Sequence, residues 1–160
     1  MWVTHVSFSP DGKLLASASR DKTVRLWLPD GTLVATLEEH KDFVNHVSFS
    51  PDGKLLASAS RDKTVRLWRP DGTLVATLEG HKNWIAHVSF SPDGKLLTSA
   101  GGDGTVRLWL SDGTLVATLE GHKNWIAHVS FSPDSKLLAS ASRDKTVRLW
   151  LPDGTLVATL

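Results

Sequence analysis

Short runs in which apolar and small polar residues alternate follow one another along the whole chain. Alternation with a period of two is typical of β-strands, and turn residues separate the runs here. In the first 40 residues the pattern predicts four strands, at Val6–Phe8, Leu14–Ser19, Val24–Trp27 and Leu33–Leu37. No segment keeps a period of 3.6 between helix caps, so we predict essentially no helix.

Turn-forming sequences join these strands. In Ser9–Gly12, Pro10 presets φ and Gly12 accepts a positive φ. Arg20–Lys22 predicts a tight turn, and Pro29–Gly31 repeats the Pro-Asp-Gly chemistry. We interpret these sequences as turns and not as phosphate-binding loops, because no P-loop or dinucleotide-binding glycine motif occurs.

The four-strand unit recurs with a period of 41 residues. The tripeptide Arg-Leu-Trp ends at Trp27, Trp68, Trp109 and Trp150, and residues 1–37 differ from residues 124–160 at only four positions. Four antiparallel strands in about 40 residues make one blade of a β-propeller. We therefore predict one all-β domain, residues 1–160, with blades at approximately 1–41, 42–82, 83–123 and 124–160.

Motifs in fixed order make the repeat recognisable. Repeat three contains Gly80-His81, Phe90–Gly94, Ser99, Asp103 and Leu108-Trp109. In this order and register, the chain resembles the WD40 repeat family over its whole length. One departure is that Leu28, Arg69, Leu110 and Leu151 stand where the family's Trp-Asp pair has Asp. The resemblance implies radially arranged blades in a toroid, and near-identical repeats indicate recent amplification or design.

The resemblance also implies a buried, hydrogen-bonded tetrad in each complete repeat. Its residues are His40, Ser58, Asp62 and Trp68 in repeat two, His81, Ser99, Asp103 and Trp109 in repeat three, and His122, Ser140, Asp144 and Trp150 in repeat four. His, Ser and Asp could also form a hydrolytic triad. We favour the structural role and predict no enzyme, because the strained turn of a nucleophile is absent and one active site is rarely copied several times.

Repeat one has Ser17, Asp21 and Trp27 but no matching histidine. The 160 residues are four short of four full periods, and the matching histidine would belong to those four. We expect an incomplete tetrad and the least stable blade there, since losing a partner in a buried network costs about 1–3 kcal/mol.

A second histidine recurs on the innermost strand of each blade, at His5, His46, His87 and His128. Such a set could in principle bind a metal ion. The copies lie on different blades, however, and no His-X-His or His-X₃-His pair occurs. We therefore expect packed or channel-lining histidines, with no metal and no cofactor.

Composition narrows the functional classes. The net charge of +1 predicts neither a nucleic-acid nor a membrane partner, and the chain has no cysteine for disulfides, thiol chemistry or Cys-based zinc sites. No apolar run approaches the ~18 residues of a membrane span. The first residues do not resemble a signal peptide, so a cytoplasmic location is the default expectation.

One face of the predicted ring combines aromatic and basic residues near the starts of the innermost strands. This basic aromatic face comprises Trp2, Phe43, Trp84, Trp125, Arg20, Arg61, Arg143 and Asn45. The matching positions of WD40 proteins often contact partners, and Trp with Arg is typical of binding hot spots. An extended peptide with acidic or phosphorylated residues would suit this face. Alternatively, the aromatic rings only cover the joints between blades.

Four thin blades do not close easily. A lone arc would expose two apolar blade faces, whereas two arcs related by a two-fold axis would form an eight-bladed ring and bury roughly 2,000 Å² or more. Our leading hypothesis is therefore a self-assembling homodimeric scaffold without catalytic activity. The alternative is a peptide- or protein-binding module that acts through the basic aromatic face.

Overall fold

The computed structural model describes residues 2–160, which form sixteen strands and no helix. The innermost strands are β1 (Val3–Phe8), β5 (Val44–Phe49), β9 (Ile85–Phe90) and β13 (Ile126–Phe131). The second strands are β2 (Leu15–Ser19), β6 (Leu56–Ser60), β10 (Leu96–Gly101) and β14 (Leu138–Ser142). The third are β3 (Val24–Trp27), β7 (Val65–Trp68), β11 (Val106–Leu110) and β15 (Val147–Trp150), and the outermost are β4 (Leu33–Leu37), β8 (Leu74–Leu78), β12 (Leu115–Leu119) and β16 (Leu156–Thr159).

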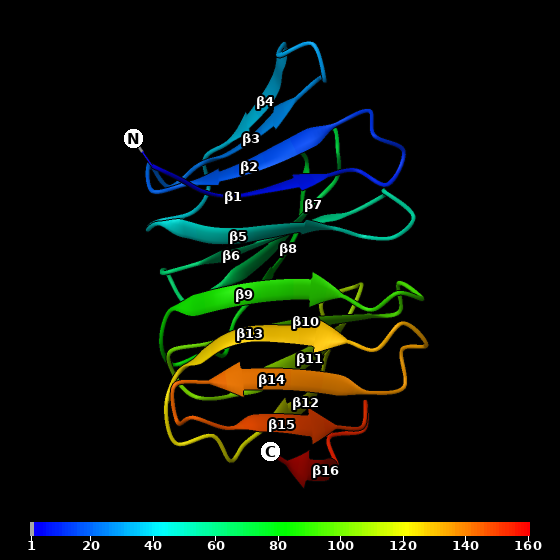
Figure 1. Ribbon diagram of the computed structural model, residues 1–160. Coiled ribbons are helices and arrows are strands. Elements are labelled where there is room, and N and C mark those ends of the chain that lie inside the picture. The colour runs from blue at the N-terminus through cyan, green and yellow to red at the C-terminus, as the bar shows by residue number, and fades with distance from the viewer. Residues whose placement is uncertain (1) are drawn as a thin grey trace.

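Each repeat folds into its own four-stranded antiparallel sheet, paired in chain order. Figure 1 shows the four sheets as successive blades of an open arc, with the first and last blades at opposite ends and β1, β5, β9 and β13 along one side. The predicted all-β blades are confirmed. The strand bounds differ slightly: the first strand begins at Val3 instead of Val6, and the second at Leu15 instead of Leu14.

The turns follow from short-range hydrogen bonds. Ser9 Oγ donates to Asp11 at 2.7 Å and accepts from the amide of Leu14 at 2.9 Å, while the amide of Gly12 donates to Ser9 O. Gly12 has a φ of 69°, a left-handed conformation that glycine adopts without strain. In repeat four Ser135 takes this position with a φ of 60°.

Apolar clusters between neighbouring blades form the core. The first blade contributes an outgoing face of small and aliphatic side chains, and the second contributes an incoming face of larger ones. The outgoing face consists of Ala16, Ala18, Val24, Leu26 and Leu37, and the incoming face of Val44, Val47, Phe49, Leu56 and Trp68. The next two junctions repeat this arrangement. Small residues in each second strand let the next blade approach closely, so packing between blades supplies most of the apolar burial.

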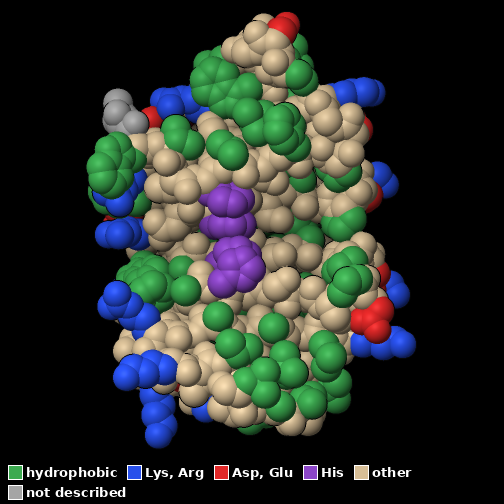
Figure 2. Space-filling model, in the orientation of Figure 1, with side chains coloured by type: hydrophobic (Ala, Val, Ile, Leu, Met, Phe, Trp, Pro, Cys, Tyr) green, Lys and Arg blue, Asp and Glu red, His purple; other side chains and the backbone are tan. Residues whose placement is uncertain are grey.

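The two ends of the arc leave one face of each kind uncovered. Phe8 is 63% exposed on the first blade, whereas the matching Phe49 is 8% exposed inside a junction. Leu160 is 71% exposed on the last blade, whereas Leu119 is 2% exposed. Figure 2 shows apolar side chains gathered at both ends of the molecule. The described chain therefore has three complete junctions and two uncovered end faces, one incoming and one outgoing.

Candidate functional site

The tetrad residues of repeat two lie together in one buried chain of hydrogen bonds. Trp68 Nε1 donates to Ser58 Oγ at 2.9 Å, and Ser58 Oγ lies 2.7 Å from Nε2 of His40. His40 Nδ1 lies 2.7 Å from Asp62 Oδ2. In the arrangement that satisfies every group, the serine donates to Nε2 and the Nδ1–H donates to the carboxylate. The tetrad thereby ties the segment before β5 to β6 and to the turn after it.

Repeats three and four build the same network. Ser99 lies 2.8 Å from His81 Nε2 and accepts from Trp109 at 2.9 Å, and Asp103 lies 2.8 Å from His81 Nδ1. The matching distances among His122, Ser140, Asp144 and Trp150 are 2.8, 2.8 and 2.9 Å. Ser58 and Ser99 have no exposed surface, so a substrate could not reach their hydroxyl groups.

The tetrad carboxylates stay ionised far into acid. Burial alone would raise the pKa of Asp62, but hydrogen bonds from His40, Thr64 and the amide of Lys41 hold the pKa well below its usual range. The pKa of Asp103 is lowered by the same balance, with His81 as its main hydrogen-bonding partner. A carboxylate that accepts several hydrogen bonds is a strong fixed acceptor, which keeps the histidine ring in place.

Repeat one brings three tetrad residues together and adds an arginine that sequence analysis did not anticipate. Ser17 accepts from Trp27 at 2.9 Å, and Asp21 accepts from the hydroxyl of Thr23 at 2.6 Å. Arg25 Nη2 lies 2.9 Å from Asp21 Oδ2, although no well-directed hydrogen bond reaches that oxygen from the described residues. The sequence signal for this ion pair was the four-residue spacing between Asp21 and Arg25. The same spacing recurs in every repeat, so it did not indicate that the pair would form in the first one.

The second histidine set forms a stacked column. Ring centroids lie 3.6 Å apart for His5 and His46, 3.9 Å for His46 and His87, and 4.0 Å for His87 and His128. Figure 2 shows histidine side chains gathered at the centre of the face that the innermost strands form. In residues 2–160, no group of three or more His, Asp or Glu side chains is placed to hold a metal ion.

Burial makes the column hard to protonate. Burial first, and then repulsion from the neighbouring histidines, lowers the pKa of His46 to about 2 and that of His87 to about 3. The innermost and second strands that surround the column carry no Asp, Glu, Lys or Arg. A positive charge formed there would therefore lack a counter-charge on these strands.

The basic aromatic face is a ladder of rings and guanidinium groups. Arg20 lies 4.3 Å from the ring centroid of Trp2 and 5.6 Å from that of Phe43, so it bridges two blades. Arg61 lies 5.2 Å from Phe43. The three arginines of the face, Arg20, Arg61 and Arg143, are exposed, and Figure 2 shows Lys and Arg side chains beside apolar ones along this edge.

The ladder changes in its second half. Trp84 and Trp125 contact each other with centroids 5.2 Å apart, and Arg143 lies 5.3 Å from Trp125. Gly102 stands where the other repeats have arginine, and a Cβ there would come within 2.7 Å of Trp84 Nε1. Trp84 thus rests directly on the Gly102 backbone. Phe43, Trp84 and Trp125 are half-buried, so these rings both cover joints between blades and remain accessible.

Asn45 has a different role from the rest of the face. Its Nδ2 donates to the carbonyl of Ile85 at 2.7 Å, and Thr4 donates in the same way to the carbonyl of Val44 at 2.6 Å. These bonds join neighbouring innermost strands. The amide of Asn45 is therefore engaged within the chain.

Comparison with known proteins decides the family. A family model described as "WD domain, G-beta repeat" matches residues 1–27, 31–69, 72–109 and 113–151. The chain belongs to the WD40 family. WD40 propellers are in general protein-interaction and scaffold modules. The Notchless protein homolog of Arabidopsis thaliana is 76% identical over 25 residues, which are 16% of this chain and 5% of that protein. The chain thus matches far less than two thirds of that relative's length.

The WD40 tetrads of repeats two to four have all four residues, whereas that of repeat one has three among the described residues. The same serine-to-alanine substitution should therefore lower the free energy of unfolding by different amounts. Ser99→Ala leaves the buried His81 Nε2 and Trp109 Nε1 without their partner, which should lower the free energy of unfolding by about 2–4 kcal/mol. Ser17→Ala removes only the acceptor of the half-buried Trp27 and should cost about 1 kcal/mol. Urea unfolding of both variants measures the difference, and equal losses would contradict this account.

The histidine column predicts acid lability. Histidine in the unfolded chain has a pKa of about 6.5. Because His46 and His87 have lowered pKa values in the folded state, the folded state binds fewer protons below about pH 6.5. The stability they confer is complete above that pH and is lost as pH falls toward 3, at up to about 1.4 kcal/mol per pH unit for each residue.

The measurement is the free energy of unfolding between about pH 6.5 and 4.5, a range above the titration of most carboxylates. The double variant His46→Gln/His87→Gln should show a clearly flatter pH dependence than the parent chain. An unchanged slope would assign the acid lability to other groups.

Proposed function

We propose that this chain is a self-assembling WD40 scaffold in which two copies close into one eight-bladed ring. The observation that carries the proposal is that the two ends of the arc expose one incoming and one outgoing face, the two kinds of face that pack together in the internal junctions. The first blade presents Val3, Val6 and Phe8, and the last presents Val147, Leu149 and Leu160.

The internal junctions show what covers such faces. Residues matching Val3 and Val6 are Val44 and Val47, which have no exposed surface and pack against an outgoing face. The residue matching Leu160 is Leu37, which is buried in the same cluster. A second copy supplies both missing partners at once, because its outgoing face fits the first blade and its incoming face fits the last. Two-fold pairing would therefore form two further junctions of the kind that already holds the chain together.

Polar contacts between blades support the same pairing. Each innermost histidine stacks on the next, so His128 of one copy would continue the column onto His5 of the other. Arg20 contacts the aromatic ring of the following blade, and Arg143 would reach Trp2 of the second copy in the same way. Eight blades need a turn of only ~45° each, within the range of known propellers.

Light scattering tests the ring. The wild-type chain should have twice the mass of one 17.4 kDa chain. Val6→Asp places a charge in the proposed junction and should reduce the mass to a single chain, because burying an unpaired carboxylate is strongly unfavourable. Val34→Asp, at another exposed valine on the outermost strand β4, is the matched control and should leave the mass unchanged.

Other masses have clear meanings. A single-chain mass for the wild type would overturn self-assembly. A mass of three chains would mean a larger ring, and an unchanged mass for Val6→Asp would place the contact elsewhere.

The second candidate is peptide binding at the basic aromatic face, and the ladder favours it. Arg20, Arg61 and Arg143 are exposed, and the aromatic rings beside them form cation–π contacts that hold the guanidinium groups. Charged donors fixed in this way would suit an extended acidic or phosphorylated peptide.

A panel of serine-containing acidic peptides, each with and without phosphate, tests this candidate by fluorescence anisotropy. The phosphorylated forms should bind more tightly, and Arg61→Ala/Trp84→Ala should abolish binding without changing the mass. Lys54→Ala/Arg69→Ala, on the opposite face, is the control. Binding that survives the first double variant, or that ignores the phosphate, would exclude this face as the site.

A further inference from the structure

The complete tetrads define how this fold holds an imidazole. His40 lies between Ser58 and Asp62, with both ring nitrogens 2.7 Å from an oxygen, and its ring meets Trp68 edge-on with centroids 6.3 Å apart. The amide of the next residue, Lys41, donates to the same carboxylate oxygen at 3.0 Å. The recognised unit is thus a histidine together with the N–H that follows it.

Repeat one has the same receiving groups in the same bonds. Trp27 donates to Ser17 at 2.9 Å, as Trp68 does to Ser58, and Thr23 donates to Asp21 at 2.6 Å, as Thr64 does to Asp62 at 2.7 Å. Ser17 is buried, yet among residues 2–160 no imidazole lies between Ser17 and Asp21. Asp21 Oδ2, which matches the oxygen that receives both His40 and Lys41, accepts no well-directed hydrogen bond from the described residues.

We propose that Ser17, Asp21 and Trp27 form a binding site for a histidyl peptide. The imidazole of the ligand would accept from Ser17 at Nε2 and donate to Asp21 from Nδ1, and the following amide would donate to Asp21 Oδ2. The ligand class is a short segment of the type Gly-His-Lys, which the chain itself uses before the third and fourth blades at residues 80–82 and 121–123.

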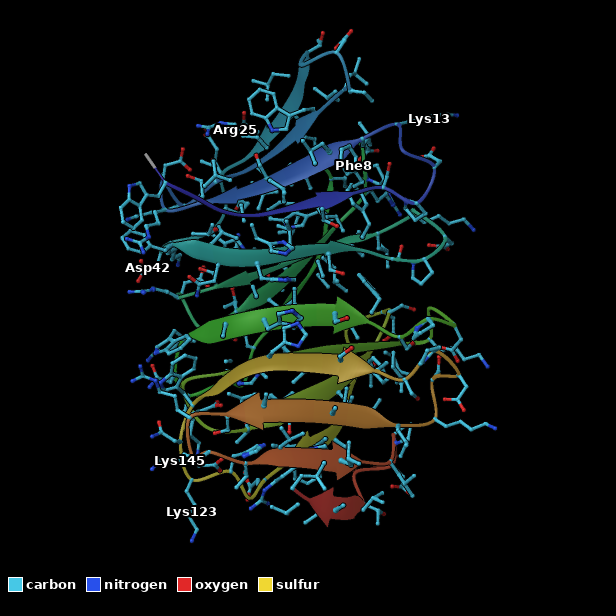
Figure 3. The ribbon with its side chains drawn as sticks, viewed as in Figure 1. Phe8, Lys13, Arg25, Asp42, Lys123 and Lys145 are labelled. Carbon is cyan, nitrogen blue, oxygen red and sulfur yellow. The ribbon has the colours of Figure 1, made fainter. Side chains whose placement is uncertain are left out.

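Arg25 is the internal competitor for this site. Its Nη2 lies 2.9 Å from Asp21 Oδ2, whereas the matching Arg66 pairs with Glu39 at 3.5 Å. Figure 3 shows Arg25 on β3 of the first blade, whose incoming face is uncovered. About a third of the Arg25 side chain is exposed, so it can turn toward water when an imidazole approaches. The ligand would replace an imperfectly directed ion pair with two directed hydrogen bonds to the same carboxylate.

The site does not depend on ring formation. All its groups belong to the first blade, and in the complete blades the corresponding histidine contacts residues of its own blade. The Leu160→Asp variant, which places a charge in the same proposed junction but on the last blade, should therefore bind the peptide as the parent does.

Calorimetric titration with acetyl-Glu-Gly-His-Lys-amide, the sequence of residues 79–82, tests the proposal. The matched peptide with alanine in place of histidine should bind at least about tenfold more weakly, since it lacks the charge-assisted hydrogen bond. Arg25→Gln should tighten binding of the histidine peptide, and Asp21→Asn should weaken it by at least about tenfold.

The indole N–H signal of Trp27 in nuclear magnetic resonance spectra, assigned with the variant Trp27→Phe, reports peptide binding in the folded parent chain. It therefore does not depend on whether a variant folds. This signal should shift with the histidine peptide and stay in place with the alanine peptide. Extending the chain at its N-terminus by Glu-Gly-His-Lys should fill the site, shift the same signal without added peptide, and abolish binding. Equal affinity for both peptides, or no saturable binding of either up to about 10 mM, would overturn the proposal.

Discussion

Face-to-face packing of blades is the interaction on which the rest of this structure depends. A four-stranded sheet of about 40 residues is too small to bury a core within itself, so each blade gains stability by covering its neighbour. The small residues of β2 meet the larger ones of β5, and the same pairing recurs at the next two junctions. The stability of the chain therefore comes mainly from the packing between blades. The two uncovered end faces lack such packing and contribute least to it.

Polar side chains fix the positions of strands and loops that apolar packing alone would specify only approximately. The tetrad joins two strands and two loops through groups that each need a partner, so it specifies where the segment before each blade must lie. In the first blade Arg25 reaches Asp21 instead, in an ion pair whose arginine side chain is about a third exposed and whose carboxylate is largely buried. Thr4 and Asn45 add bonds between innermost strands. The same serine and aspartate positions thus hold a histidine side chain in the complete repeats, whereas in the first repeat they hold none from the described residues.

The repeat period and turn residues sufficed to predict the blades, because both depend on local sequence. Strand ends were less accurate: the early start of β1 at Val3 depends on pairing with β2. The motif order indicated which tetrad residues come together, but sequence alone could not show that Arg25 would reach Asp21. The sequence indicated packed or channel-lining histidines, but not that the ring of His5 would stack on that of His46, because the stacking depends on the spacing between blades. Asn45 was grouped with the basic aromatic face because the matching positions of WD40 proteins often contact partners, and the sequence did not indicate that its amide donates to the carbonyl of Ile85.

The near identity of the junctions has a consequence for how the chain reaches its native state. Val44, Val47 and Phe49 belong opposite the first blade, yet nearly the same side chains recur on the third and fourth blades. Little distinguishes a blade's proper neighbour from another copy, so order is kept mainly by the short connections between blades. Synthesis from the N-terminus, which presents one blade at a time, favours correct pairing. Refolding from denaturant at high concentration offers every blade many equivalent partners, and there the same repetition promotes exchange of blades between molecules.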